Sequence, residues 1–350
     1  MNQYSYPKFL LFILFLLSPV LAFSQIPPGY YDDAEGLYDE ELRTALYNII
    51  SPHSIKSYSS LWDYFFDTDR KENGYVWDMY SDVPGGEPSY NYVFFDDQCG
   101  NYSGEGSCYN REHSFPKSWF DNQSPMNTDL YHLYPTDGYT NGQRGNYPFG
   151  ETENPNWTST NGSKRGSSSY PGYTGTIFEP IDEYKGDFAR TYFYMITRYK
   201  YKISSWNSPM LQGDGFSDWA LSLLLDWHSQ DPVSDKETNR NNEVYNIQIN
   251  RNPFIDHPEY AIDIWDSTSG LITYTSEVHL WYADHSINIS AENSSFETIV
   301  VYDTMGRTIG EYRFDNNKVV LDQSLISGVY IAQLQGSSVI TQIKFVVLNF

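Results

Sequence analysis

The chain changes character near residue 270, and this change constrains its fold more than any other feature. Residues 35–265 are rich in Tyr, Trp, Asn and Asp and contain the best helical patterns. Beyond the segment DSTSG (266–270), short alternating apolar runs are separated by Gly, Asn and Asp. Such alternation is typical of antiparallel strands joined by turns. With 350 residues and 40% hydrophobic content, the chain is long enough for two cores, so we predict an α+β domain followed by a small antiparallel β-sandwich.

Three segments of the first part repeat apolar residues at helical spacing: residues 39–51, 186–199 and 217–228. Spacings of three and four residues predict amphipathic helices there, and we expect Ser217 to cap the third. Between the helices lie two long stretches rich in Gly, Ser, Asn and Pro, at residues 89–109 and 154–180. We predict that both are irregular, and loops of this length are usually functional or mobile.

The N-terminus has the pattern of a signal peptide. Lys8 precedes the apolar run FLLFILFLLSPVLAF, which ends at the small-residue segment 22–24. The run is shorter than the roughly 20 residues of a membrane-spanning helix, and no later segment is apolar for that length. We therefore expect residues 1–24 to be removed and the mature protein to be soluble and exported.

The chain has two cysteines, Cys99 and Cys108, within the glycine- and serine-rich segment DDQCGNYSGEGSCYN. In an oxidising compartment this spacing favours a disulfide that closes a small loop, with two free thiols as the alternative. The bridge would restrict the chain directly before Arg111.

The net charge of −23 limits the kinds of partner. A non-specific nucleic-acid binder that depends on counterion release is normally basic, so the charge alone argues against nucleic acid. The acidic balance also has a simpler interpretation, because exported proteins gain solubility from it.

Polar residues with chemical potential gather in the segments CYNREHSFPKSWF (108–120) and TDLYHLYPTDGYTNGQRGNYPFGE (128–151). The chain lacks the His-Glu-x-x-His zinc motif, the Gly-x-Ser-x-Gly elbow and the phosphate loop. The two segments instead supply two imidazoles, a carboxylate, two amides and a guanidinium, from Glu112, His113, His132, Asn141, Arg144 and Asn146. A Glu-His pair alone is most often a surface or capping pair, whereas this cluster points to a site.

The residue types suit one kind of chemistry. Carboxylate and amide oxygens such as those of Glu112 and Asn141 are hard ligands for Mg²⁺ or Ca²⁺. A neutral imidazole, here His113, is well matched to accept a proton from water near neutral pH. Arginine presents a planar fork to a phosphate. The combination predicts metal-assisted hydrolysis of a phosphodiester.

At these motifs the sequence resembles the endonuclease I family of secreted and periplasmic nucleases, which are built on a ββα-metal core. The likeness extends from about residue 37 to 265 and includes DFARTYFYMITRY and the segment from HSQDPVSDKETNR to HPEYAIDIW. By this resemblance His113 is the general base, and Glu112 and Asn141 bind Mg²⁺, with Ca²⁺ or Mn²⁺ as alternatives. The resemblance implies cleavage of DNA, and of RNA as well, without sequence preference and with 5′-phosphate products.

Other positions are matched less directly. His132 stands where some members have asparagine, so it is either a ligand or phosphate-positioning group or a buried, hydrogen-bonded histidine. We take Arg144 as the arginine that stabilises the phosphate, and Gly145 replaces the serine that usually precedes Asn146. A local cationic patch would bind phosphates on an otherwise acidic surface: Arg111, Lys117, Arg144, Lys164 and Arg165. The tyrosine-rich loops could stack on bases or simply fill the core.

The tail resembles a second family. The elements VYDTMGRTI and SGVYIAQLQ, followed by a lysine-bearing last strand, are similar to the C-terminal sorting domain of the type IX secretion system. An accessory binding sandwich is the alternative. We therefore predict a signal peptide (1–24), a catalytic domain (25–268), a linker (269–276) and a sorting domain (277–350).

We expect a monomer, secreted or at the cell surface, whose partners are its nucleic-acid substrate and the type IX machinery. Two other functions stay open: a surface-binding protein whose nuclease-like domain is inactive, and a phosphodiesterase that acts on another substrate.

Overall fold

The computed structural model describes residues 26–265 and the tail segments 279–283, 286–290, 296–303, 307–314, 318–321, 325, 328–336 and 340–347. The predicted signal peptide and linker lie outside the described residues. Among the residues that are described, no helix is both long and apolar enough to cross a membrane.

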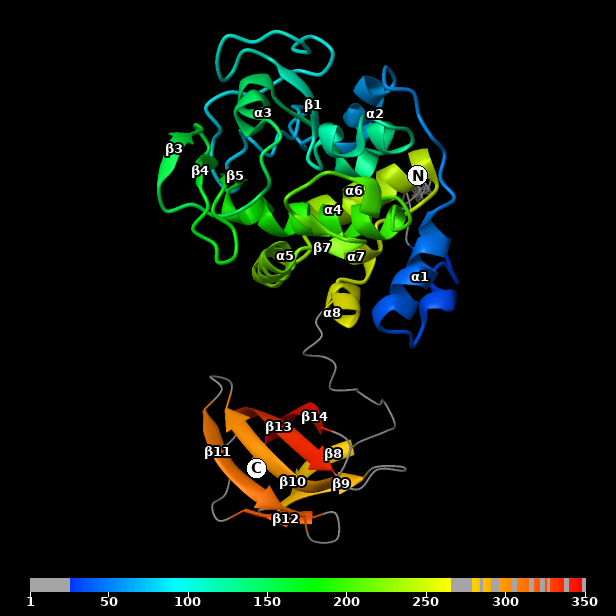
Figure 1. Cartoon of the computed structure of the whole chain (residues 1–350), viewed down its shortest axis with the longest axis vertical. Helices are drawn as coiled ribbons and strands as arrows, with labels where there is room; N and C mark the ends of the chain where they lie inside the picture. The colour runs from blue at the N-terminus through cyan, green and yellow to red at the C-terminus, as the bar shows by residue number, and fades with distance from the viewer. Residues whose placement is uncertain are drawn as a thin grey trace, which may run out of the picture.

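The first part of the chain forms a mixed helical and stranded domain (Figure 1). Its helices are α1 (Asp39–Ile50), α2 (Leu61–Thr68), α3 (Gly138–Arg144), α4 (Lys185–Arg198), α5 (Asp218–Gln230), α6 (Asp235–Gln248), α7 (Pro253–Asp256) and α8 (Glu259–Trp265). Its strands are β1 (Tyr109–His113), β2 (Leu133–Asp137), β3 (Pro155–Thr158), β4 (Lys164–Ser167), β5 (Thr176–Glu179), β6 (Leu211–Gln212) and β7 (Gly215–Phe216). The three helices expected from apolar spacing correspond to α1, α4 and α5.

Helix α4 is the centre of the core. Every residue from Lys185 to Thr197 is buried, so the helix is covered on all sides rather than along one apolar face. Its aromatic side chains pack closely with other rings, with Phe188 and Phe149 4.6 Å apart between ring centroids. Burying a large aromatic or aliphatic side chain contributes about 1.5–3 kcal/mol, so this helix fixes the frame on which the remaining elements are placed.

Helix α5 begins where the sequence predicts, but its start differs in detail. Ser217 occupies the position before the helix, yet its side chain makes no capping hydrogen bond. The hydroxyl instead donates to the carbonyl of Pro209 over 3.3 Å. Ser217 is therefore at the N-cap position as expected, but its side chain makes no capping hydrogen bond.

Helix α6 has a polar sequence that apolar periodicity does not reveal. A capping box begins it, in which the Ser234 hydroxyl and the Glu237 carboxylate each accept from the other residue's backbone N–H. Glu237 also forms a buried ion pair with Arg190 of α4. The helix thus packs through charged and amide groups that are satisfied within the protein.

The two stretches predicted to be irregular differ in outcome. Residues 89–109 are irregular except for an isolated bridge and the first residue of β1. Residues 154–180 instead contain an antiparallel sheet of β3, β4 and β5. These strands are short, and β3 and β4 are mostly polar. Gly166 of β4 lies so close to Thr152 and Asn154 that a Cβ there would lie 2.5 Å from the Thr152 hydroxyl. Such strands lack the alternation from which strands are recognised.

Two antiparallel strands followed at once by a helix carry the motif residues. Strand β1 pairs with β2 from Tyr109 opposite Asp137 to His113 opposite Leu133. Helix α3 begins at Gly138, directly after β2 ends at Asp137. The Asp137 carboxylate caps the helix by accepting from the N–H of Thr140 over 2.6 Å. Figure 1 shows β1 and α3 side by side. This β–β–α order brings the two polar segments of the sequence together.

The tail forms an antiparallel β structure of its own. Its strands are β8 (His279–Ala283), β9 (Ser286–Ser290), β10 (Phe296–Asp303), β11 (Thr308–Arg313), β12 (Lys318–Val320), β13 (Gly328–Gly336) and β14 (Ile340–Val347). They form one sheet in the order β11-β10-β13-β14 and another in the order β12-β9-β8. Ile287 and Val319 of the second sheet share a core with Ile299, Val301 and Leu334 of the first. The strands expected from alternation are confirmed.

Candidate active site

A cleft of about 310 Å³ lies at the β1–β2–α3 unit. It brings together the three residues that the sequence assigns to the metal and the base: Glu112, His113 and Asn141. Four further predicted residues also line it: Arg111, Lys117, Arg144 and Asn146. His132 does not. Glu112 and His113 both reach the cleft because β1 ends at His113 and the chain turns before Pro116.

Glu112 is held at one oxygen and open at the other. Its Oε1 accepts from the Tyr80 hydroxyl over 3.0 Å and lies 3.2 Å from Nη1 of Arg144. No side chain among the described residues donates to Oε2, although the backbone N–H of His113 lies near the carboxylate. Burial raises the pKa of Glu112, while the charge of Arg144 acts in the opposite direction. A buried carboxylate with one free oxygen is suited to a cation.

The tautomer of His113 follows from its partner. Its Nε2 lies 3.1 Å from the backbone carbonyl of Asn127. A carbonyl can only accept, so Nε2 carries the hydrogen and Nδ1 of the neutral ring has a free lone pair. Nδ1 has no partner within the described part of the chain. Burial, followed by the neighbouring His132, holds the pKa of His113 well below its usual range, so the ring is neutral near neutral pH.

Asn141 is oriented by a residue that the sequence analysis does not identify. Its Nδ2 donates to Oδ1 of Asn110 over 2.7 Å, which leaves Oδ1 of Asn141 without a donor among the residues described. Asn110 also lines the cleft. The signal for it is the strand period of two: Asn110 and Glu112 are on the same face of β1.

Helix α3 is fixed from two directions. The buried Asp78 carboxylate accepts from the backbone N–H of Asp137 over 2.9 Å, and burial raises its pKa to about 7. On the other side, Tyr102 packs so tightly on α3 that a Cβ at Gly142 would lie 2.2 Å from its hydroxyl oxygen. Tyr102 belongs to the loop that is closed by the Cys99–Cys108 disulfide. This disulfide confirms the predicted bridge. The loop therefore holds the helix that carries Asn141.

The end of α3 requires glycine. Gly145 has a φ of +56° and its N–H bonds the carbonyl of Asn141 over 2.8 Å. Side chains with a Cβ rarely adopt this conformation. The next residue, Asn146, is exposed at the cleft.

Arg144 differs from the expected phosphate-binding role. It is 1% exposed, and its guanidinium contacts Glu112, the carbonyls of His113 and Ser114, and the Tyr192 hydroxyl. Its donors are therefore directed at the protein. In this structure the Nη1 and Nη2 groups of Arg144 hold Glu112 and the turn after β1, so they are not directed at a substrate.

His132 is completely buried. Its Nε2 donates to the carbonyl of Met126 over 2.7 Å, and its ring centroid lies 5.3 Å from that of His113. In this structure His132 is thus buried and hydrogen-bonded, as in the second of the two alternatives that the sequence left open.

The predicted cationic patch is smaller than expected. Lys164 lies 3.5 Å from Glu179, and Arg165 donates to Gln143 over 2.7 Å. Neither residue lines the cleft. Of the five expected cations, Arg111 and Lys117 line the cleft without an ion-pair partner among the described residues.

The donor set fits a hydrated hard cation. The described residues contain no group of three or more His, Cys, Asp or Glu side chains that could enclose a metal. The free Oε2 of Glu112 and Oδ1 of Asn141 are both oxygens, which suits Mg²⁺ because that ion keeps several waters and is often held by few protein ligands.

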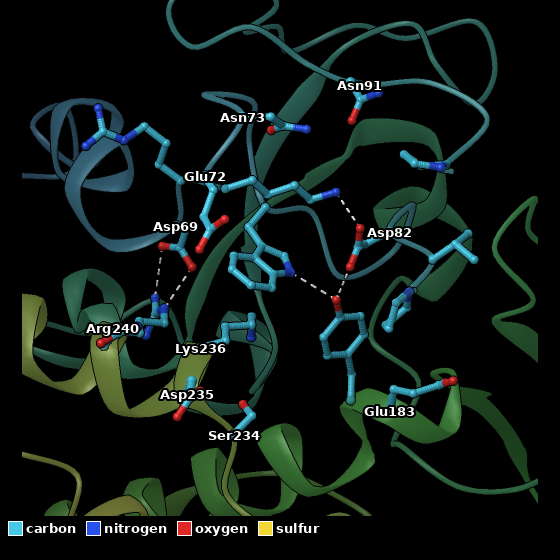
Figure 2. A pocket seen from close by; sticks show the side chains of 18 of the residues that line it. Asp69, Glu72, Asn73, Asp82, Asn91, Glu183, Ser234, Asp235, Lys236 and Arg240 are labelled. Atoms are coloured by element: carbon cyan, nitrogen blue, oxygen red, sulfur yellow. Dashed lines mark hydrogen bonds and ion pairs between the residues drawn. The ribbon is translucent and has the colours of Figure 1, made fainter. Parts of the chain in front are cut away.

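A second cavity, of about 790 Å³, lies between the segments that follow α2 and the start of α6. Figure 2 shows one of its cations, Arg240, bonded to Asp69. Lys71 is likewise paired with Asp82. No histidine lines this cavity, so it lacks a proton acceptor suited to neutral pH, and the smaller cleft is the better candidate.

Comparison with known proteins gives the family. The sequence profile described as Endonuclease I matches residues 39–259. The chain belongs to the Endonuclease I family. A second profile, the secretion-system C-terminal sorting domain, matches residues 283–348, and this confirms the type IX tail.

Curated relatives agree with this family. An extracellular ribonuclease of Bacillus amyloliquefaciens is 35% identical over 262 residues, covering 71% of this chain and 82% of the relative. An extracellular ribonuclease of Bacillus subtilis (strain 168) is 34% identical over 246 residues, 67% of this chain and 78% of the relative. Endonuclease-1 of Buchnera aphidicola subsp. Baizongia pistaciae is 29% identical over 134 residues, 38% of this chain and 48% of the relative. This Endonuclease I protein is therefore a secreted nuclease, a phosphodiester hydrolase.

Proposed function

We propose that this protein is a metal-dependent endonuclease that hydrolyses DNA and RNA without sequence preference and leaves 5′-phosphates, using a ββα-metal core. One observation carries the proposal. Three free atoms belong to residues of the same cleft: Oε2 of Glu112, Nδ1 of His113 and Oδ1 of Asn141. Two are oxygens suited to Mg²⁺ and the third is a lone pair suited to a proton.

The residues have separate parts in the reaction. Nδ1 of His113 accepts a proton from the attacking water while the water oxygen forms its bond to phosphorus. The bond from phosphorus to the 3′ oxygen breaks, and that oxygen takes a proton from solvent. The Nε2–H bond to the Asn127 carbonyl becomes stronger on the charged imidazolium, which stabilises the protonated ring. Glu112 and Asn141 would hold the metal, which supplies positive charge against the phosphate oxygens.

Phosphate contacts are assigned to Arg111 and Lys117. Both line the cleft and neither is ion-paired with a described residue. Such contacts go to the backbone and carry no sequence information, which agrees with cleavage that does not depend on sequence. The name of two relatives, extracellular ribonuclease, supports RNA as a substrate, and DNA rests on the resemblance to the endonuclease I family.

A nicking experiment tests the proposal. Purified mature protein is incubated with supercoiled plasmid and with RNA in Mg²⁺, in Ca²⁺, in Mn²⁺ and in chelator, and product ends are tested for a 5′-phosphate by ligation. We expect cleavage with Mg²⁺ and none with chelator. Cleavage that persists in chelator would exclude metal dependence, and no cleavage with any ion would favour the inactive surface-binding alternative.

A further inference from the structure

Two aromatic residues of the same cleft have no role in the reaction described above. Tyr58 and Trp62 lie just before and within α2, far from the motif segments in sequence. Both line the cleft with Glu112, His113 and Asn141, and both keep part of their surface exposed. The Tyr58 ring is nearly parallel to the His113 ring, at 14° and 6.1 Å between centroids.

Arg111 links the two rings. Its guanidinium carbon lies 3.8 Å from the Tyr58 ring centroid and 4.4 Å from that of Trp62. One guanidinium nitrogen, Nη1, also donates to the backbone carbonyl of Tyr58 over 2.7 Å. The flat faces of the guanidinium are thus used by the rings, while further N–H groups at its edge stay available to a phosphate.

The indole N–H of Trp62 has no acceptor among the residues that the structure describes. Its ring packs edge-on against Tyr109 at 5.6 Å between centroids. An aromatic side chain that lines a polar cleft, with its N–H free, is suited to a ligand that has both a flat apolar face and hydrogen-bond acceptors.

We propose that Tyr58 and Trp62 form a stacking surface for the nucleobases next to the cleaved phosphate, and that the enzyme therefore prefers unpaired strands over duplexes. The inference rests on the proposed nuclease function. Nucleobases have the required flat faces and acceptor atoms, and every base offers such a face, so stacking is compatible with a lack of sequence preference.

The strand preference follows from where base faces are found. In a duplex, both faces of each base are covered by its neighbours, so a base reaches a protein ring only after it is unstacked, at a cost in free energy. In a single strand the faces are already accessible. The distinction does not require the 2′-hydroxyl, so it applies to RNA and to single-stranded DNA.

The charge of the protein supports the same conclusion. A net charge of −23 and two cleft cations without ion-pair partners supply little of the phosphate attraction on which duplex binders rely. Base stacking offers an attraction that does not depend on positive charge.

The test compares strands that differ only in their bases. We would measure kcat/KM in Mg²⁺ on a short labelled single-stranded DNA, on the same sequence as a duplex, and on an abasic strand of equal length and charge. The wild type should cleave the single strand fastest. Trp62→Leu and Tyr58→Leu should each lower kcat/KM on the normal single strand about 5- to 150-fold more than on the abasic strand, where only the support of Arg111 is lost.

Two controls separate stacking from structure. Trp62→Phe keeps a flat ring and should retain most of the activity, whereas a purely structural role against Tyr109 would be damaged by Phe and Leu alike. Tyr201→Leu removes an exposed tyrosine outside the cleft and should behave as wild type. Equal losses on normal and abasic strands, or a wild type that cleaves both strands equally fast, would overturn the inference.

A binding measurement separates this test from the test of the proposed function. Fluorescence anisotropy in chelator measures the affinity for each strand without cleavage. If the wild type cleaves nothing, the proposed function fails, yet a loss of single-strand affinity in Trp62→Leu would still support the stacking surface. Equal affinities of the wild type for normal and abasic strands would refute the stacking surface.

Discussion

Replacement of Arg144 by methionine should show how much the buried ion pair between Arg144 and Glu112 contributes to stability. Arg144 and Glu112 form a buried ion pair with an N–O distance of 3.2 Å. Arg144→Met retains much of the side-chain volume but leaves the Glu112 carboxylate without its cation. It also removes the donors to the carbonyls of His113 and Ser114.

The magnitude follows from this geometry. Removing one partner of a buried ion pair costs about 3–5 kcal/mol, because the remaining charge is buried without compensation. For a domain of this size the melting temperature should then fall on the order of 10 °C. A double variant with Glu112→Gln removes both charges, so its loss should be smaller than the sum of the two single losses.

The assay is thermal unfolding with chelator and with Mg²⁺ or Ca²⁺. The uncompensated Glu112 should bind the cation more tightly, so the ion should restore more stability in Arg144→Met than in wild type, about 1.4 kcal/mol for each tenfold gain in affinity. Arg251→Met is the matched control, because it breaks another buried pair, with Asp256, outside the cleft. An equal ion effect in both variants would refute the placement of the cation at Glu112.

Four other outcomes are expected. His113→Ala should leave folding and metal affinity nearly unchanged and lower turnover about 10²- to 10⁴-fold; full activity near neutral pH would exclude it as the base. Asn110→Ala frees the Asn141 amide and should weaken Mg²⁺ binding about 10- to 100-fold in calorimetry, so unchanged affinity would place the ion elsewhere. A Cys99→Ser, Cys108→Ser double variant should lose about 2–3 kcal/mol in urea unfolding and lose activity through the loop that holds α3; unchanged stability would contradict this. Burial, followed by the charge of Arg190, lowers the pKa of His228 from 6.5 to about 4. As the pH falls, the unfolded chain is protonated at this histidine before the folded protein is, so stability should fall between pH 6.5 and 4, by about 2 kcal/mol at pH 5. The variant His228→Gln should show a smaller loss of stability over this pH range.

The sequence alone determined the family and most of the element types. The adjacency of Glu112 and His113 identifies the nuclease motif, and the alternating tail predicts its strands, because these signals lie within short segments of chain. Helix α4 was also predictable from its spacing, but its burial on all sides was not, since this depends on what packs around it. The polar strands of 154–180 were missed for the same reason, because their pairing partners rather than their own residues define them.

The tertiary structure decided which polar side chains face the cleft. Sequence favoured Arg144 for the phosphate, yet its Nη1 and Nη2 groups bond carbonyls and a carboxylate inside the protein. Arg111, which also lines the cleft, has no ion-pair partner among the described residues, and rings from α2 and the segment before it, including a residue 53 positions away, hold its guanidinium. The direction in which a side chain donates is set by contacts between segments distant in sequence. A residue pattern fixes the available chemistry, and only the packing fixes where it is presented.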